Sequence, residues 1–393
     1  MFKVTAIAKF SVVLSAAVAF GTGSVGQAFG ASPALNPSAA KDRAQAAAAT
    51  AELLTLRNWG LDNSDYPSHI NARKAWKITK GSQQINVCVV DTGIDASHPD
   101  LKDNICRGAG EEYGYDFVTG KKNPGDSHGH GSHVAGIIGA TAKAGAGASG
   151  VAPNVCITAA RYYSDTATGA QNLANTVKAI NYCVDKGAHI INYSGGGAEF
   201  SAAEMKAIQR AEAKGILFVA AAGNEYQNTD ESGNAYYPAA YGLNNIIAVA
   251  ATNNRNVLLP SSNWGKKHVH VAAPGESIFS TLPKGRYGYL TGTSQATAFV
   301  SGLAALILTE NPKLKPSEVR DIIMSSADKI EGLKTKVASG GRINAFNALR
   351  MTVAKRDGEN SSSVAQIDAE DGVVSAQAQK PEAKRVQRGV AFH

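Results

Sequence analysis

The feature that most constrains the fold is a series of short apolar runs that alternate with helix-like patterns. The runs expected to be strands are Ile85–Val90, Val155–Ala160, Ala188–Tyr193, Ile216–Ala221, Ile246–Ala250 and His268–Ala272. Most are nearly continuous in apolar residues, which is typical of strands buried on both faces. The helices expected between and after them are Asn172–Asp185, Ala202–Lys214 and Pro316–Ser326. This alternation predicts a three-layer α/β/α fold with a mostly parallel central sheet, whose ligands bind at the carboxyl ends of the strands.

The first thirty residues have the character of a targeting segment. Lys3 and Lys9 provide positive charge, and the apolar stretch Phe10–Phe20 is too short to span a bilayer. Small residues near Gly30 suit a signal peptidase, so residues 1–30 are predicted to be a cleaved signal peptide. An uncleaved membrane anchor is the alternative.

The remaining chain divides by composition. Residues 31–57 are a short N-terminal segment rich in Ala, Ser and Pro, and residues 58–351 are expected to form one folded domain. Residues 352–393 contain few large apolar groups and are expected to be a disordered tail. The chain has a net charge of +7, but it contains no run of Lys or Arg longer than two residues. This pattern argues against nucleic-acid binding.

Four cysteines, Cys88, Cys106, Cys156 and Cys183, allow three disulfide pairings, and their spacing matches no zinc signature. Export would permit disulfides. Buried free thiols are the alternative, because Cys88 and Cys156 lie inside strand-like runs.

Three side chains that could take part in catalysis lie near glycines, each at the end of a predicted strand or the start of a predicted helix. Asp91 in VVDTGID directly ends a buried strand, where a carboxylate is either a turn former or a functional anion. His130 in HGSHVAG begins a helix pattern that runs to about Ala140. Ser294 in GTSQAT precedes the apolar helix Phe299–Leu308, where it is either a helix cap or a nucleophile. Each residue alone has an ordinary structural explanation.

Together the three residues predict nucleophilic catalysis. A serine hydroxyl needs a neighbouring base that takes its proton, and the base needs a buried acid that fixes its tautomer. A fourth segment, AAAGNE, follows another buried strand with Asn224, whose amide suits an oxyanion. We therefore expect Asp91, His130, Ser294 and Asn224 to be catalytic residues.

The order of these segments resembles that of the subtilase family, the subtilisin-like serine proteases. VVDTGID, HGSHVAG and GTSQAT resemble its aspartate, histidine and serine motifs, although the family usually has Thr where this chain has Ser132. Asn224 falls where the family keeps its oxyanion asparagine. The resemblance implies a subtilisin-like peptidase domain at residues 58–351. It also implies a secreted serine endopeptidase that works through a Ser-His-Asp triad and an acyl-enzyme.

The resemblance also identifies a substrate-binding segment. Ser194, Gly195, Gly196 and Gly197 fall where the family has an extended strand that pairs with substrate and walls the first specificity pocket. The family often has Leu at the position of Gly195, so we expect a groove that is more open on one side. Tyr236 lies near the expected pocket floor, where a bulky ring would favour smaller substrate side chains.

The resemblance implies no cofactor for the chemistry and no catalytic metal, and it leaves a structural calcium open. Asp100 occupies a position that is commonly a calcium ligand, whereas the loop Ala142–Ala148 lacks the Asn often found in that site. A turn or a helix cap is the other explanation for Asp100. We expect protein or peptide substrates, no nucleic-acid partner, no membrane association after signal removal, a monomer, and an extracellular or periplasmic location.

Three other functions compete with this one. His128, His130 and His133 have the spacing of a zinc site, but that function would leave Asp91 and Ser294 without a role. A catalytically inactive subtilase could act as a binding protein, although all three triad positions are filled. A transpeptidase would use the same acyl-enzyme, because the chemistry is shared until water or an amine attacks.

Overall fold

The computed structural model describes residues 57–63, 65–143, 147–358 and 362–371. The predicted signal peptide, residues 31–56 and residues 372–393 lie outside the described residues. No helix among those described is both long and apolar enough to cross a membrane.

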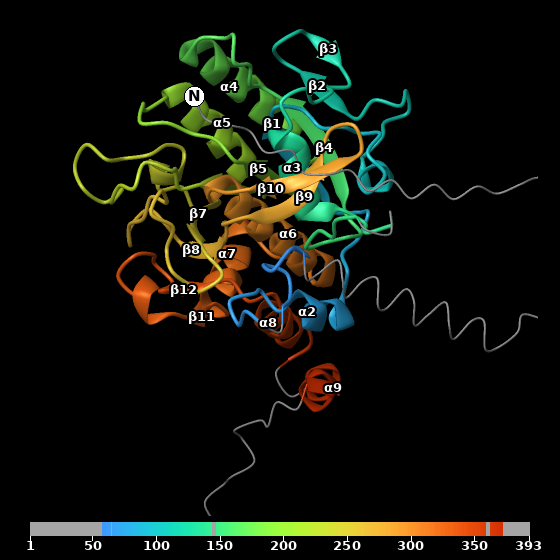
Figure 1. Ribbon diagram of the computed structural model, residues 1–393, viewed down its shortest axis with the longest axis vertical. Coiled ribbons are helices and arrows are strands. Elements are labelled where there is room, and N and C mark those ends of the chain that lie inside the picture. Colours follow the sequence, from blue (N-terminus) through green and yellow to red (C-terminus); the bar gives the residue numbers. More distant parts are fainter. Residues whose placement is uncertain (1–56, 64, 144–146, 359–361, 372–393) are drawn as a thin grey trace, which may run out of the picture. The chain divides into compact units, whose positions relative to one another are not determined.

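A large sheet organises the described part of the chain (Figure 1). Its strand order is β11-β12-β8-β7-β6-β5-β1-β4-β2-β3, and every pair from β12 to β2 is parallel. Only the outermost pairs, β11 with β12 and β2 with β3, are antiparallel. β9 and β10 form a separate antiparallel hairpin.

The strands are β1 Asn86–Asp91, β2 Gly114–Asp116, β3 Lys121–Lys122, β4 Cys156–Arg161, β5 Ile190–Tyr193, β6 Leu217–Ala221, β7 Ile246–Thr252, β8 Val271–Pro274, β9 Ile278–Leu282, β10 Arg286–Leu290, β11 Asp328–Lys329 and β12 Gly341–Arg342. The helices are α2 Ala72–Ile78, α3 His130–Gly139, α4 Gly169–Asp185, α5 Ala202–Ala213, α6 Thr293–Glu310, α7 Pro316–Ser325, α8 Ala345–Asp357 and α9 Ser362–Asp371.

Alternate residues of β1 enter two different hydrophobic cores. Val87 and Val89 pack in the core that contains buried residues of α3, α6 and α8. Cys88 and Val90 pack in the core that contains buried residues of α4 and α5. The sheet is therefore covered on both faces, which confirms the predicted three-layer arrangement and explains the continuous apolar runs.

The predicted strands match observed ones, with one clear shift. The run His268–Ala272 was expected to be a strand, but β8 begins at Val271. The backbone N–H of His268 instead donates to the carboxylate of Asp230 at 3.2 Å. That side-chain contact delays the entry of the chain into the sheet.

Two disulfides settle the open question of cysteine pairing. Cys88 of β1 bonds Cys183 of α4, and Cys106 bonds Cys156 at the start of β4. No cysteine is free, so the alternative of buried thiols is wrong. The first bond ties the central strand to a covering helix, and the second ties a loop to the sheet. Both close long loops, which lowers the entropy of the unfolded chain.

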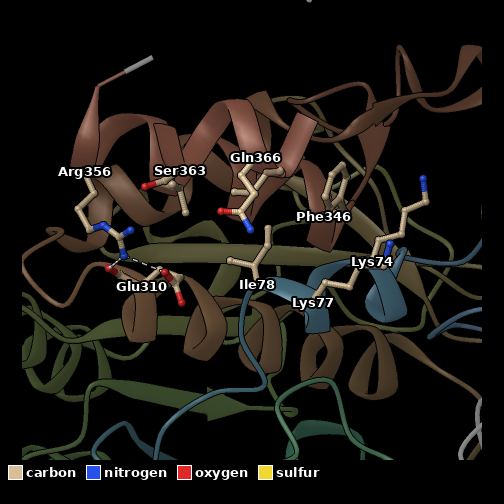
Figure 2. Close-up of a pocket in the computed structure, with 10 residues that line it drawn as sticks. Lys74, Lys77, Ile78, Glu310, Phe346, Arg356, Ser363 and Gln366 are labelled. Atoms are coloured by element: carbon tan, nitrogen blue, oxygen red, sulfur yellow. Dashed lines mark hydrogen bonds and ion pairs between the residues drawn. The ribbon is translucent and has the colours of Figure 1, made fainter. Parts of the chain in front are cut away.

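The end of the described chain is more ordered than its composition suggests. α8 continues to Asp357, six residues beyond the boundary predicted at 351, and α9 lies in the segment expected to be disordered. α9 covers a cavity of about 300 Å³ that is also lined by α2, α8 and Glu310 (Figure 2). Arg356 pairs with Glu310 at 2.8 Å, and Val364 of α9 is buried. A few apolar contacts and one ion pair hold a segment whose composition is mostly polar.

Candidate active site

The carboxylate of Asp91 ends the central strand β1 and is almost fully buried, with 3% of the residue exposed. Its Oδ1 accepts a hydrogen bond from the backbone N–H of Thr92 at 2.7 Å and lies 2.8 Å from Nδ1 of His130. A buried anion requires such partners to offset its desolvation. Asp91 therefore bonds the turn through Thr92 and contacts His130 through the same oxygen, so its position is compatible with either predicted role.

His130 is the first residue of α3, and two glycines bring that helix against β1. Gly129 precedes it with φ of 104°, a conformation that favours glycine. A Cβ at Gly131 would lie 2.1 Å from the carbonyl oxygen of Gly93 and 3.2 Å from Oδ1 of Asp91. Only glycine at this position permits the approach that places the imidazole beside the carboxylate.

The contact with Asp91 sets the tautomer and basicity of the imidazole. Nδ1 donates its proton to the carboxylate, which leaves Nε2 as the basic nitrogen. Burial lowers the pKa of His130, but the charge and hydrogen bond of Asp91 and the charge of Asp126 outweigh it, so the pKa is raised above 6.5. The imidazolium that forms on proton uptake is thus stabilised by two carboxylates.

Ser294 is the second residue of α6 and is largely buried. Its hydroxyl donates to the carbonyl oxygen of Ser194 at 3.0 Å, and the hydroxyl of Ser194 donates back to the carbonyl of Ser294 at 3.1 Å. Ser194 directly follows β5, whose Tyr193 is the register partner of Val90 in β1. The next residues of these neighbouring strands, Ser194 and Asp91, therefore lie at the same sheet edge, about 5 Å apart across the ladder.

The described residues contain no hydrogen bond between His130 and Ser294. The hydroxyl of Ser294 is turned toward Ser194, while α3 and α6 pack directly against one another. A serine side chain has three staggered rotamers, and catalytic hydrogen bonds often form only when substrate is bound. The structure thus joins His130 to Asp91 directly and brings Ser294 to the same edge through Ser194.

Asn224 lies in the loop after β6 with one end of its amide held in place. Its Oδ1 accepts hydrogen bonds from the backbone N–H of Thr293 at 3.0 Å and from the Thr293 hydroxyl at 3.2 Å. Its Nδ2 donates to no acceptor among the described residues, and the residue is exposed. The N–H of Ser294 belongs to the first turn of α6, where helical N–H groups have no partner within the helix. Both donors suit a negatively charged oxygen.

The segment Ser194–Gly197 forms an extended edge beside Ser294. The N–H of Gly197 donates to the carbonyl of Tyr237 at 2.9 Å, and the N–H of Tyr237 donates back at 2.7 Å. A Cβ at Gly196 would lie 2.4 Å from the ring of Tyr236, so the predicted floor residue packs against this segment.

The groove is not more open at Gly195, so that expectation is wrong. A Cβ there would lie 2.4 Å from the hydroxyl oxygen of Tyr162, and ring atoms of Tyr193 lie at 3.1 and 3.2 Å. Tyr193 of β5 and Tyr162, which follows β4, lie at the ends of the two strands that flank β1, and they occupy the space that a leucine at this position would take.

Asp126 is a residue of the site that the sequence motifs did not predict. Its Oδ1 accepts from the hydroxyl of Thr92 at 3.0 Å and from the N–H of Gly129 at 2.8 Å. Its Oδ2 accepts from the N–H and the hydroxyl of Ser132 at 2.9 and 2.7 Å. The carboxylate therefore links the chain just before and just after His130 to Thr92, in the turn that follows Asp91. The available signal was an acid four residues before the histidine.

The three histidines of the proposed zinc spacing do not converge. His133 is fully buried, and its Nε2 lies 3.0 Å and 3.2 Å from the carbonyl oxygens of Ile278 and Gly288. Burial lowers the pKa of His133 to about 4, whereas His128 is exposed. Among the described residues, no group of three His, Cys, Asp or Glu side chains is placed to hold a metal ion.

Asp100, the residue considered as a calcium ligand, is fully buried and accepts hydrogen bonds through its carboxylate. Its Oδ2 accepts from the hydroxyl of Tyr287 at 2.8 Å and from the N–H of Ala148 at 2.9 Å. A Cβ at Gly147 would lie 1.9 Å from the same oxygen. These contacts suit the predicted structural role of Asp100, and the structural calcium stays a prediction.

Comparison with known proteins agrees with this arrangement. The family model described as the subtilase family matches residues 82–362. A thermophilic serine proteinase from Bacillus sp. (strain AK1) is 39% identical over 283 residues, which is 72% of this chain and 66% of that protein. Thermitase from Thermoactinomyces vulgaris is 37% identical over 284 residues, 72% of this chain and 95% of that protein. Subtilisin-like protease 2 from Plasmodium falciparum (isolate 3D7) is 34% identical over 317 residues.

The fold and the matched residues define the class of this protein: it is a subtilisin-like serine endopeptidase. The chain belongs to the subtilase family. It spans just under two thirds of the Bacillus protein, 66%, and 23% of the Plasmodium protein.

Proposed function

We propose that this chain is a secreted endopeptidase that hydrolyses peptide bonds through Ser294, His130 and Asp91. Ser294 Oγ attacks the carbonyl carbon of the scissile peptide while Nε2 of His130 takes the hydroxyl proton. His130 then gives that proton to the leaving amine, and the acyl chain remains on Ser294. A water molecule, deprotonated by His130, hydrolyses the ester and restores the serine.

The observation that carries this proposal is the 2.8 Å contact between Nδ1 of His130 and Oδ1 of Asp91. It presents the basic nitrogen of the imidazole at the sheet edge where Ser294 hydrogen-bonds Ser194. Asp91 orients the imidazole and stabilises the imidazolium during proton transfer. The substrate would extend along Ser194–Gly197 and pair with its backbone.

Secretion is part of the proposal because several features agree with an oxidising compartment. The N-terminal thirty residues have a charged start and a short apolar stretch, and the structure contains two disulfides. We propose an extracellular or periplasmic location.

The proposal is tested by incubating the purified protein with a peptide library and identifying products by mass spectrometry. Internal cleavages that generate new amino and carboxyl termini are expected, and a chelator should leave them unchanged because no metal takes part. Loss of cleavage with a chelator, or products that are only ligated peptides, would replace this function with a metallohydrolase or a transpeptidase.

Replacing Asn224 with alanine is expected to lower kcat by about two to three orders of magnitude. The amide donor acts on charge that appears only in the transition state, so KM should change much less than kcat. Steady-state kinetics on a chromogenic peptide measure both constants. Asn234→Ala, in the same loop region, is the matched control, because the Asn234 amide donates to Glu231. An Asn224→Ala variant with unchanged kcat would remove the oxyanion role from this residue.

Activity should fall reversibly as the pH drops through the pKa of His130, which lies above 6.5. The base must be neutral to accept a proton from Ser294. Because its folded-state pKa is raised, His130 itself contributes stability at low pH, so this loss is not unfolding. Buried His133, with a pKa of about 4, does weaken folding as pH falls below 6.5, so each sample is returned to alkaline buffer and reassayed. A profile of kcat/KM that is flat from about pH 5 to about pH 9 would contradict the role of His130.

A further inference from the structure

A cavity of about 470 Å³ lies beside the segment that is proposed to pair with substrate. Gly196 and Gly197 form part of its wall, while Ser194 at the start of the segment bonds Ser294. An extended chain advances about 3.3 Å per residue. A substrate strand along this segment would therefore pass the cavity about two to four residues from the scissile bond.

Aromatic rings and carboxylates dominate the polar chemistry of the cavity wall. The residues concerned are Tyr162, Tyr163, Tyr193, Tyr237, Glu199 and Glu204. The lining among the described residues includes no Lys, Arg or His. Carboxylates attract cations directly, and tyrosine faces attract them through their quadrupole. The wall therefore has the character of a site for a positive group.

Glu204 is the acid that lies deepest in this wall, with 3% of the residue exposed. Its Oε2 accepts a hydrogen bond from the hydroxyl of Tyr241 at 2.7 Å. Its Oε1 accepts from none of the described residues, and no described Lys, Arg or His pairs with this carboxylate. Burial raises the pKa of Glu204, although the bond from Tyr241 opposes that shift. A cation from outside the protein would offset the cost of burying this charge.

A helix-capping role does not account for the position of Glu204. It is the third residue of α5, where a glutamate often accepts from the N–H of the capping residue, here Ser201. That N–H instead donates to the hydroxyl oxygen of Tyr241 at 3.2 Å. The carboxylate of Glu204 is thus left to Tyr241 and to the cavity.

We infer that this cavity binds a Lys or Arg side chain of the substrate, and that Glu204 selects it. The inference rests on the proposed endopeptidase function and specifies its substrate class. The ε-ammonium or guanidinium group would donate to Oε1 of Glu204, while its methylene stem would lie against the tyrosine rings. Glu199, which is exposed, would add negative potential at the surface of the same cavity.

The test uses fluorogenic peptides that differ at one position, scanned over four residues on each side of the scissile bond. Lys is compared with norleucine and Arg with citrulline, so that charge changes while length does not. At one position, two to four residues from the scissile bond, the charged peptide should have a kcat/KM at least about tenfold higher. Glu204→Gln, which keeps the hydrogen bond to Tyr241, should reduce that ratio to about two or less.

Glu212→Gln on the same helix is the matched control, because Glu212 does not line the cavity and its variant should keep the full ratio. Glu204→Asp retains the negative charge, so this variant should keep part of the preference for the charged peptide. A protein that cleaves peptides but never prefers the charged residue overturns this inference and leaves the proposed function intact. A Glu204→Gln variant that keeps the full preference for the charged peptide also overturns the inference and leaves the proposed function intact. Absence of any cleavage overturns the proposed function, and this inference with it.

Discussion

Replacing Ser294 with alanine is expected to abolish measurable hydrolysis, with a loss in kcat on the order of a million-fold, as in subtilisin. The alanine variant lacks the oxygen that forms the acyl-enzyme, and no neighbouring hydroxyl is held in the same place. The neighbouring Ser194 follows a different strand, β5. Its carbonyl oxygen accepts the hydrogen bond from the Ser294 hydroxyl, so Ser194 does not supply a substitute nucleophile. Casein hydrolysis, corrected for contaminating protease with an active-serine reagent, measures the effect.

The exposed serine Ser261 provides the control, since Ser261→Ala should keep the activity of the unmodified protein. The fold is expected to survive in both variants, because removal of one hydroxyl leaves the packing of α6 unchanged. A folded Ser294→Ala variant that hydrolyses casein at the original rate would refute the assignment of the nucleophile.

Replacing Asp91 with asparagine is expected to lower kcat by about four orders of magnitude. The asparagine keeps the shape of the side chain, but its amide favours the wrong tautomer of His130 and cannot stabilise the imidazolium. The effect on stability should be small by comparison, because the bond from Thr92 to Oδ1 has an equivalent acceptor in asparagine. Kinetics on a chromogenic peptide and a thermal melt separate the two effects.

Asp95→Asn is the matched control for Asp91→Asn. Asp95 lies in the same turn and accepts from Ser97 and Lys284, but it has no contact with His130. Its variant should keep kcat within about threefold of the original, as expected for a half-buried hydrogen-bonding group away from the imidazole. Equal losses in the two variants would mean that the turn, and not the contact with His130, is what activity requires.

The central strands of the sheet could be predicted because buried parallel strands have a local sequence pattern, a continuous apolar run, that can be read without knowing their distant contacts. β1, β4, β5 and β6 are short, nearly continuous apolar runs, and their covering helices have regular apolar spacing. Asp91 could be identified as a candidate functional residue because it directly follows such a run. Burying a carboxylate there costs free energy unless the group has hydrogen-bonding partners.

Other features depend on contacts between distant segments, which local patterns do not encode. The position of Tyr162 against Gly195 arises because β4 and β5 flank the same strand, β1. The pairing of Cys88 with Cys183 was one of three arrangements that the sequence allows. Asp126 resembles an ordinary turn-forming acid in sequence, and its importance appears only when its bonds to Thr92 and Ser132 are seen.

The β9–β10 hairpin and α9 were missed for a related reason. The partly exposed strand β10 has a mixed burial pattern, so its sequence lacks the continuous apolar run that identified the central strands. α9 has a weakly apolar sequence, and it is held by Val364 and by packing against α8. Such segments are defined by the surface that they cover.

His130 and Asp91 are proposed to make Ser294 nucleophilic. Labelling with an active-serine phosphonate, followed by peptide mapping with mass spectrometry, measures this nucleophilicity at each serine. We expect one adduct, on Ser294, that forms rapidly in the unmodified protein and is lost in His130→Ala. An adduct on a different serine, or one that forms on Ser294 at the same rate without His130, would contradict it.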